Sequence, residues 1–225
     1  GALLAVGIMA PQAAFGQTAI GNGVVTNTAN CTNPSAGNQS VAIGCGTTAN
    51  GSASTATGHS TSVNGDNGVA IGTAATATGN ASIAIGYSMG VNGLNAIGIG
   101  VFANATGTNA LAIGGNARAL VGGAIAFGTN STAGAGNALA MGNSANAGFA
   151  NSVAIGVSST TGADAATAVG NGARSLGNSS LALGTQALAM GSSTVAVGQG
   201  AGSGSTVANS SWVGVGIAAG TLGQG

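Results

Sequence analysis

Residues 81–86 read Ala-Ser-Ile-Ala-Ile-Gly, and close relatives of this hexapeptide stand at 39–44 (Gln-Ser-Val-Ala-Ile-Gly) and 151–156 (Asn-Ser-Val-Ala-Ile-Gly). The closing glycine returns every 14 residues through twelve units. These repeat glycines are Gly44, Gly58, Gly72, Gly86, Gly100, Gly114, Gly128, Gly142, Gly156, Gly170, Gly184 and Gly198. A fixed period of this length is typical of a solenoid, in which each coil stacks on its neighbours.

The residues before each repeat glycine alternate in size. In Ile83-Ala84-Ile85 a large apolar residue stands on either side of an alanine, and most units keep this order. Alternation of period two, closed by glycine, indicates a short β-strand. In many units a second glycine follows seven residues later, as Gly79 and Gly93 do. We therefore expect each coil to contain two short strands and two tight turns, with glycine supplying the positive φ of the turns.

Two facings of the main strand are compatible with this alternation. The one we favour points the large Ile and Val columns into the coil and leaves the alanine column outside as a smooth apolar stripe. The sequence also allows the opposite facing, with alanine inside and Ile or Val at a contact between subunits. Either facing leaves apolar side chains uncovered on a single chain, so we expect a homo-oligomer.

The composition excludes several classes of function. The 225 residues include two arginines, two aspartates, and no lysine or glutamate. Two arginines cannot form the basic surface that nucleic acids require. No stretch approaches the ~18 consecutive apolar residues of a membrane-spanning helix, so we expect no membrane contact by this segment itself.

We interpret residues 1–225 as one continuous roll. The spacing of the glycines divides this roll into regular coils and less regular parts. Gly21 and Gly44 lie nine residues further apart than one period, and Gly198 and Gly216 lie four residues further apart. The predicted parts are coils at 1–21, an insertion at 22–39, regular coils at 40–198, an irregular last coil at 199–217 and a C-terminal exit at 218–225.

The quoted units resemble the S-V-A-I-G head repeat of YadA-like trimeric autotransporter adhesins. This resemblance covers nearly the whole chain. It implies an all-β, left-handed parallel β-roll that forms a homotrimer on the bacterial cell surface. It also implies attachment to host cells or to matrix proteins such as collagen, fibronectin or laminin, autoaggregation in some members, and an outer-membrane anchor in a C-terminal region outside this segment.

Two other functions remain open beside adhesion. The segment could be a structural spacer that presents a binding domain located elsewhere in a longer protein. An ice-binding solenoid is a weaker alternative, because proteins of that class present threonines in ordered columns. Here Thr55-Ala56-Thr57 and Thr76-Ala77-Thr78 fall at different positions of the repeat.

Cys31 and Cys45 are separated by one period and could occupy one column in adjacent coils. The oxidising periplasm that a surface protein crosses favours a disulfide between them. His59 falls at the same repeat position as Cys45, but no fourth ligand is apparent for a metal. We therefore predict a Cys31–Cys45 disulfide, no metal site and no cofactor.

An enzymatic function is not expected. His59 is the only histidine, and neither aspartate is part of a recognisable nucleophile motif. Asp66 and Asp164 share one repeat position seven periods apart, which is about 34 Å along a solenoid. Arg118 and Arg174 also share a position and should point outward. They are candidate ligand contacts, each tripled by symmetry in a trimer, or simply solvated charges.

Overall fold

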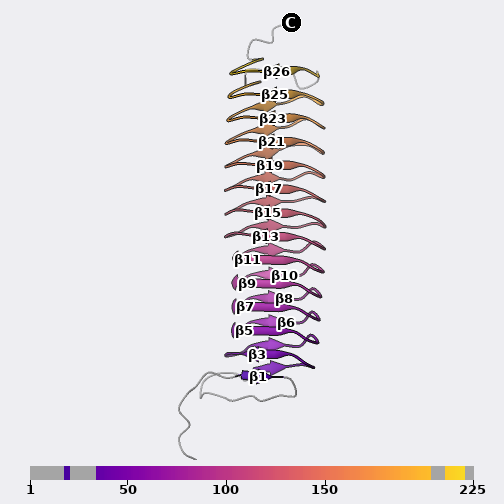
Figure 1. Cartoon of the computed structure of the whole chain (residues 1–225), viewed down its shortest axis with the longest axis vertical. Helices are drawn as coiled ribbons and strands as arrows, with labels where there is room; N and C mark the ends of the chain where they lie inside the picture. Colours follow the sequence, from indigo (N-terminus) through magenta and orange to yellow (C-terminus); the bar gives the residue numbers. More distant parts are fainter. Residues whose placement is uncertain (1–17, 21–33, 204–210, 221–225) are drawn as a thin grey trace, which may run out of the picture.

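A computed structural model of the chain describes residues 18–20, 34–203 and 211–220. These residues form a rod of stacked coils that rises from β1 to β26 (Figure 1). Two sheets run along the rod, one of 14 strands and one of 12, and each regular coil contributes one strand to each sheet. The parallel β-solenoid with 14-residue coils predicted from the glycine spacing is confirmed. Within the described ranges no helix is long and apolar enough to cross a membrane.

The strands of the two sheets alternate along the chain. The larger sheet contains β1 (Thr18–Ile20), β3 (Val41–Ile43), β5 (Thr55–His59), β7 (Val69–Thr73), β9 (Ile83–Tyr87), β11 (Ile97–Val101), β13 (Leu111–Ile113), β15 (Ile125–Phe127), β17 (Leu139–Met141), β19 (Val153–Ile155), β21 (Thr167–Val169), β23 (Leu181–Leu183), β25 (Val195–Val197) and β26 (Val213–Val215). The smaller sheet contains β2 (Ser35–Ala36), β4 (Thr48–Ala49), β6 (Ser62–Val63), β8 (Thr76–Ala77), β10 (Gly90–Val91), β12 (Asn104–Ala105), β14 (Arg118–Ala119), β16 (Thr132–Ala133), β18 (Asn146–Ala147), β20 (Thr160–Thr161), β22 (Arg174–Ser175) and β24 (Leu188–Ala189).

The ends of the stack depart from the plain repeat. β1 pairs with β3 in the antiparallel direction, which differs from the parallel stacking that the register of residues 1–21 predicts. The rest of that segment lies outside the described residues. β2 already pairs in parallel with β4, so the stack begins within the range 22–39 that the sequence suggests is an insertion. At the other end β26 pairs with β25 across the longer spacing before Gly216.

The favoured facing of the main strand is wrong, and the opposite facing is the one observed. Ala84 and its equivalents in the other coils are fully buried, whereas Ile83 and Ile85 on either side are only partly covered. The interior consists of four columns of small residues, dominated by alanine with some serine and threonine. The strands of each sheet contribute one column, as Ala84 and Ala77 do, and the residue immediately before each strand contributes another, as Ser82 and Ala75 do. Alanine is therefore the core residue of this solenoid, and the larger apolar residues lie outside.

The reason is the narrow space between the two sheets. A Cβ added to Gly98 would lie 2.6 Å from Cγ2 of Val91 and 2.7 Å from Cε of Met89, which face it from the other side of the coil. In the same way a Cβ on Gly68 would lie 2.7 Å from Cγ1 of Val63. Val63, Met89 and Val91 are thus each faced by a glycine. Two facing columns of Ile or Val would not fit, because interiors are close-packed.

The repeat glycines and the half-period glycines serve different purposes, although the sequence analysis assigned a positive φ to both. All twelve repeat glycines have φ between +114° and +148°, a region that other residues rarely adopt. The half-period Gly79 has no positive φ, and its role is close approach, because a Cβ there would strike the backbone of Gly93 in the next coil. The left-handed turn positions are occupied by residues such as Asn95 (φ +55°) and Ser88 (φ +49°).

The last coil is closed by Trp212. This residue stands four positions before Gly216, where the regular coils place a small inward side chain. Its indole lies against Gly202, Gly214 and Gly220, each of which would clash with the ring if it carried a Cβ. The ring packs against the C-terminal cluster of buried alanines and so covers the end of the core.

Candidate functional site

The outer side of the larger sheet is a long apolar surface, which we call the apolar face. It is formed by the residues one and three positions before each repeat glycine, such as Ile83 and Ile85. Side chains in the middle of the stack remain well exposed, with Phe127 at 48%, Met141 at 41% and Leu183 at 41%. A continuous exposed surface of large apolar residues is the mark of an interaction site.

A small aromatic cluster lies at the corner where the chain leaves the larger sheet. Tyr87 ends β9, and its ring makes an edge-to-face contact with Phe102, with ring centroids 5.7 Å apart and planes at 78°. Val101 is the strand partner of Tyr87 in the next coil. About half of each of these three side chains is exposed. The sequence analysis did not single them out, although Tyr87, Val101 and Phe102 are large residues within two positions after a repeat glycine, where most coils carry small or polar residues.

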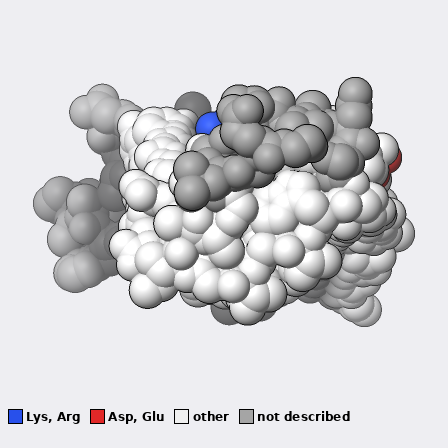
Figure 2. Space-filling view, turned by 90° about the horizontal axis from the view of Figure 1, so that it is seen from above, with Lys and Arg blue, Asp and Glu red and all other residues white. Residues whose placement is uncertain are grey.

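The outer side of the smaller sheet, here called the polar face, carries hydroxyl and amide side chains. In its first coils these groups bond along the rod axis. Asn50 Nδ2 donates to Asn64 Oδ1 at 3.0 Å, and Thr78 Oγ1 donates to Asn92 Oδ1 at 2.6 Å. Viewed along the rod, the visible surface of the described residues is almost entirely uncharged, with an arginine on a long side and an acidic residue at a narrow end (Figure 2).

Arg118 and Arg174 lie on the polar face, as the repeat position predicts. They begin the two-residue strands β14 and β22, and both are exposed while the next residue, Ala119 or Ser175, is buried. Four coils separate them, so each has its own set of neighbours. Arg118 lies between Asn104 and Thr132, and Arg174 lies between Thr160 and Leu188.

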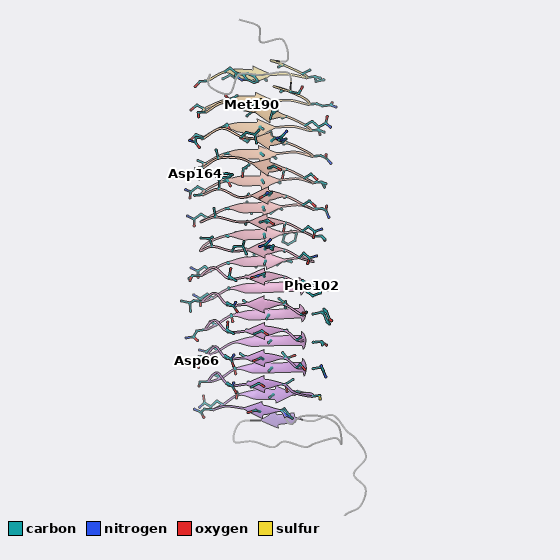
Figure 3. The ribbon with its side chains drawn as sticks, turned by 180° about the vertical axis from the view of Figure 1, so that it is seen from behind. Asp66, Phe102, Asp164 and Met190 are labelled. Atoms are coloured by element: carbon teal, nitrogen blue, oxygen red, sulfur yellow. The ribbon has the colours of Figure 1, made fainter. Side chains whose placement is uncertain are left out.

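Asp66 and Asp164 occupy one edge of the rod, opposite to the edge that carries Phe102 (Figure 3). Each carboxylate accepts a hydrogen bond from the backbone of the preceding coil. The N–H of Ser52 donates to Asp66 Oδ1 at 2.8 Å, and the N–H of Ala150 donates to Asp164 Oδ1 at 3.0 Å. Asn80 does the same for the N–H of Asp66 at 3.1 Å. These side chains tie coils together, and the two aspartates are too far apart to act on one substrate.

His59 and the cysteines form no recognisable reactive centre in the described part of the chain. His59 ends β5 and is exposed. No group of three or more His, Cys, Asp or Glu side chains that could hold a metal is found among the described residues. Cys31 lies outside them, and no described cysteine is free. The Cys31–Cys45 disulfide therefore stays a prediction.

Gly90 and Asn104 are two residues of the polar face that the sequence analysis missed. A Cβ added to Gly90 would meet nothing within 4 Å, so the fold does not require a glycine at this position for steric reasons. Asn104 Oδ1 is buried and has no hydrogen-bond partner. The sequence does contain a sign of the Gly90 opening, because the same repeat position holds the larger Thr76, Asn104 and Arg118 in nearby coils.

Comparison with known protein families gives one clear match. The model of the YadA head domain repeat matches residues 35–61, 64–88, 92–117, 150–173 and 175–201. Together these ranges cover more than half of the chain and extend over most of the coils described above. No curated protein matches the chain.

Proposed function

Because this chain belongs to the YadA head domain family, we propose that it is the adhesive head of a trimeric autotransporter, displayed on a bacterial surface. The observation that carries the proposal is the apolar face on a solenoid whose own core is already filled with alanine. A rod that exposes such a surface needs partners, and the family is one of adhesins. The proposed activity is attachment by contact, without catalysis.

In the proposed assembly three left-handed rolls lie side by side and cover one another's apolar faces. The apolar face extends along the larger sheet from β3 to β26, interrupted by Thr55 and Thr57 in β5 and by Thr167 in β21, so most of the length of the rod can take part. Its residues are uncharged and mostly apolar, so identical copies can meet along it without charge repulsion, which favours a symmetric contact. Covering side chains that are 41–48% exposed at Ile71, Phe127 and Leu183 would contribute hydrophobic stabilisation.

This arrangement leaves the polar face and the corners available to a host ligand. Neutral hydroxyl and amide groups bind through hydrogen bonds, and each contact is weak by itself. Three copies in a trimer, and many trimers on a cell, raise the apparent affinity through multivalency. We propose matrix proteins such as collagen, fibronectin and laminin as the targets, autoaggregation as a second outcome of the same surface, and anchoring in the outer membrane by a region outside this segment.

The test is binding of the purified head to surfaces coated with collagen, fibronectin or laminin, and to host cells. We expect saturable binding that changes little between low and moderate salt, because the protein surface that would contact the ligand carries very few charges. A folded oligomer that binds none of these surfaces would reject adhesion in favour of the spacer function. A steep loss of binding with salt would reject the proposed neutral contacts.

A further inference from the structure

Gly90 leaves an opening in the column of outward side chains on the polar face. It begins β10, and its strand neighbours are Thr76 in the preceding coil and Asn104 in the following coil. Neighbouring strands are about 4.8 Å apart, so each of these side chains borders the space above Gly90. An added Cβ would meet nothing within 4 Å, which makes the position open to a ligand.

Asn104 borders this opening with an unsatisfied acceptor. Its Oδ1 is buried and has no hydrogen-bond partner, a state that costs free energy unless a donor is supplied. Thr76 lies two coils, about 9.6 Å, from Asn104, too far for a direct hydrogen bond, and two hydroxyl groups of the adjacent outward column are already used. Thr106 Oγ1 donates to the carbonyl of Leu120 at 3.0 Å, and Thr78 Oγ1 donates to Asn92 at 2.6 Å. Asn104 itself is only partly buried, so a rotation of its amide toward Gly90 would present this free acceptor to a hydroxyl group from outside the protein.

Arg118 adds a cation on the other side of Asn104. The two residues are partners in the parallel pairing of β12 and β14, and Arg118 is exposed. The described carboxylates belong to Asp66 and Asp164, which occupy a corner of the rod and lie at least three coils, or about 14 Å, away along the axis. No carboxylate of the described residues therefore lies beside the guanidinium group.

We propose that Gly90, Asn104 and Arg118 form a binding site for an acidic sugar, meaning a sugar residue that carries a carboxylate and a neighbouring hydroxyl group. The guanidinium binds the carboxylate through paired hydrogen bonds, and the hydroxyl group donates to Asn104 Oδ1. The sugar ring lies over Gly90. This inference rests on the proposed adhesive function and adds one charged contact to its neutral contacts, with host glycans that contain uronic or sialic acids as the target. Binding of a small acidic probe should therefore weaken with salt, whereas attachment of the whole head, through many neutral contacts, should change little.

Arg174 provides a matched control within the chain. It has the same repeat position, the same sheet and a similar exposure as Arg118. Its strand neighbours are Thr160 and Leu188, so it lacks both the glycine opening and the unsatisfied amide. A general attraction between arginine and acidic sugars would involve both residues equally, whereas the proposed site involves Arg118 alone.

The experiment measures binding of a hyaluronan tetrasaccharide, of sialyllactose and of neutral lactose to the folded, wild-type head. We expect at least one acidic probe to bind more tightly than lactose. Arg118→Ala should weaken that binding by about tenfold or more, because a hydrogen bond to a charged group is lost. Gly90→Val, which fills the opening, should weaken it similarly, and Arg174→Ala should leave it unchanged.

Thermal melts of each variant would show that the fold is intact, and Gly90→Ala serves as a further check because its Cβ meets no atom. Equal losses in the Arg118 and Arg174 variants would overturn the proposal, as would acidic probes that bind no better than lactose. Measuring attachment to host cells distinguishes failure of the acidic-sugar site from failure of the proposed adhesive function. If wild type attaches and Arg118→Ala attaches equally well, this site is wrong and adhesion stands, whereas a wild-type head that never attaches contradicts adhesion itself.

Discussion

The coils that contain β5, β7, β9 and β11 turn differently from those that contain β13 to β25. In the first group the five-residue strand continues through the repeat glycine and the residue after it, as in Ile83–Tyr87. In the second group the strand ends before the glycine, and a tight turn follows. There the N–H of Ala117 donates to the carbonyl of Gly114 at 3.3 Å, and the N–H of Ser131 donates to that of Gly128 at 3.2 Å.

The cores of these long-strand and short-strand coils differ as well. Among the residues that the structure describes, Val63, Met89 and Val91 are the buried ones larger than threonine, and all three belong to the long-strand coils. They are accommodated by Gly68 and Gly98 on the facing column. The exposed Tyr87–Phe102 pair and the Gly90 opening also lie in this part of the rod. The 14-residue length is thus compatible with two corner geometries, and the long-strand coils carry most of the departures from the repeat.

The largest effect is expected where both groups depend on the same glycine column. Gly72→Ala in the long-strand coils and Gly142→Ala in the short-strand coils should each lower the free energy of unfolding by about 3 kcal/mol or more. Both have φ near +135°, and each added Cβ would strike the next coil's backbone, at Gly86 or Gly156. Urea unfolding measures the change, with Gly90→Ala as control. A loss below about 1 kcal/mol at either position would contradict the steric account.

Substitutions in the core can give a short-strand coil the same buried residues as a long-strand coil. Ala145 corresponds to Met89, and Ala154 corresponds to Gly98. Ala145→Met should cost about 1–3 kcal/mol through overpacking, and adding Ala154→Gly should recover a large part of that loss. A double-mutant cycle on the free energy of unfolding measures the coupling. If the second substitution brings no recovery, the facing columns are not in steric compensation.

The smallest effect is expected at the aspartates, one in each group of coils. Asp66→Ala and Asp164→Ala each remove one exposed hydrogen bond to the preceding coil, worth about 0.5–1.5 kcal/mol. Asp66→Asn should cost less than Asp66→Ala, because Asn80 already accepts a backbone N–H in the same way. Melting curves would show the order. An Asn variant as unstable as the Ala variant would mean that the negative charge matters more than the hydrogen bond.

Much of the architecture follows from the sequence because the repeat is so regular. The glycine spacing predicts the coil length, the parallel stack and the columns, and the hexapeptides at 39–44 and 81–86 predict the family. The facing of the main strand could not be read in this way. Alternation of Ile and Ala states that the two sides differ, but only the distance between the sheets decides which side is the core.

The candidate site was less accessible to sequence reasoning for a similar reason. Arg118 and Arg174 look equivalent by repeat position and composition, and the pattern offers no ground for preferring one. Their difference arises from Gly90 and Asn104 in preceding coils, where an open position and an unpaired oxygen depend on three-dimensional packing. The antiparallel pairing of β1 was equally hidden, because the register of Thr18-Ala19-Ile20 matches the regular coils.

The central claim is that alanine fills the solenoid and that the large apolar residues outside it are covered by identical copies. Sedimentation equilibrium of the purified chain tests this most directly. A trimer of 20.3 kDa chains has a mass of about 61 kDa (3 × 20.3), and we expect that mass for wild type and for Thr160→Asp on the polar face. Ile155→Asp on the apolar face should shift the mass toward the monomer. A stable, folded wild-type monomer of 20.3 kDa would contradict the account.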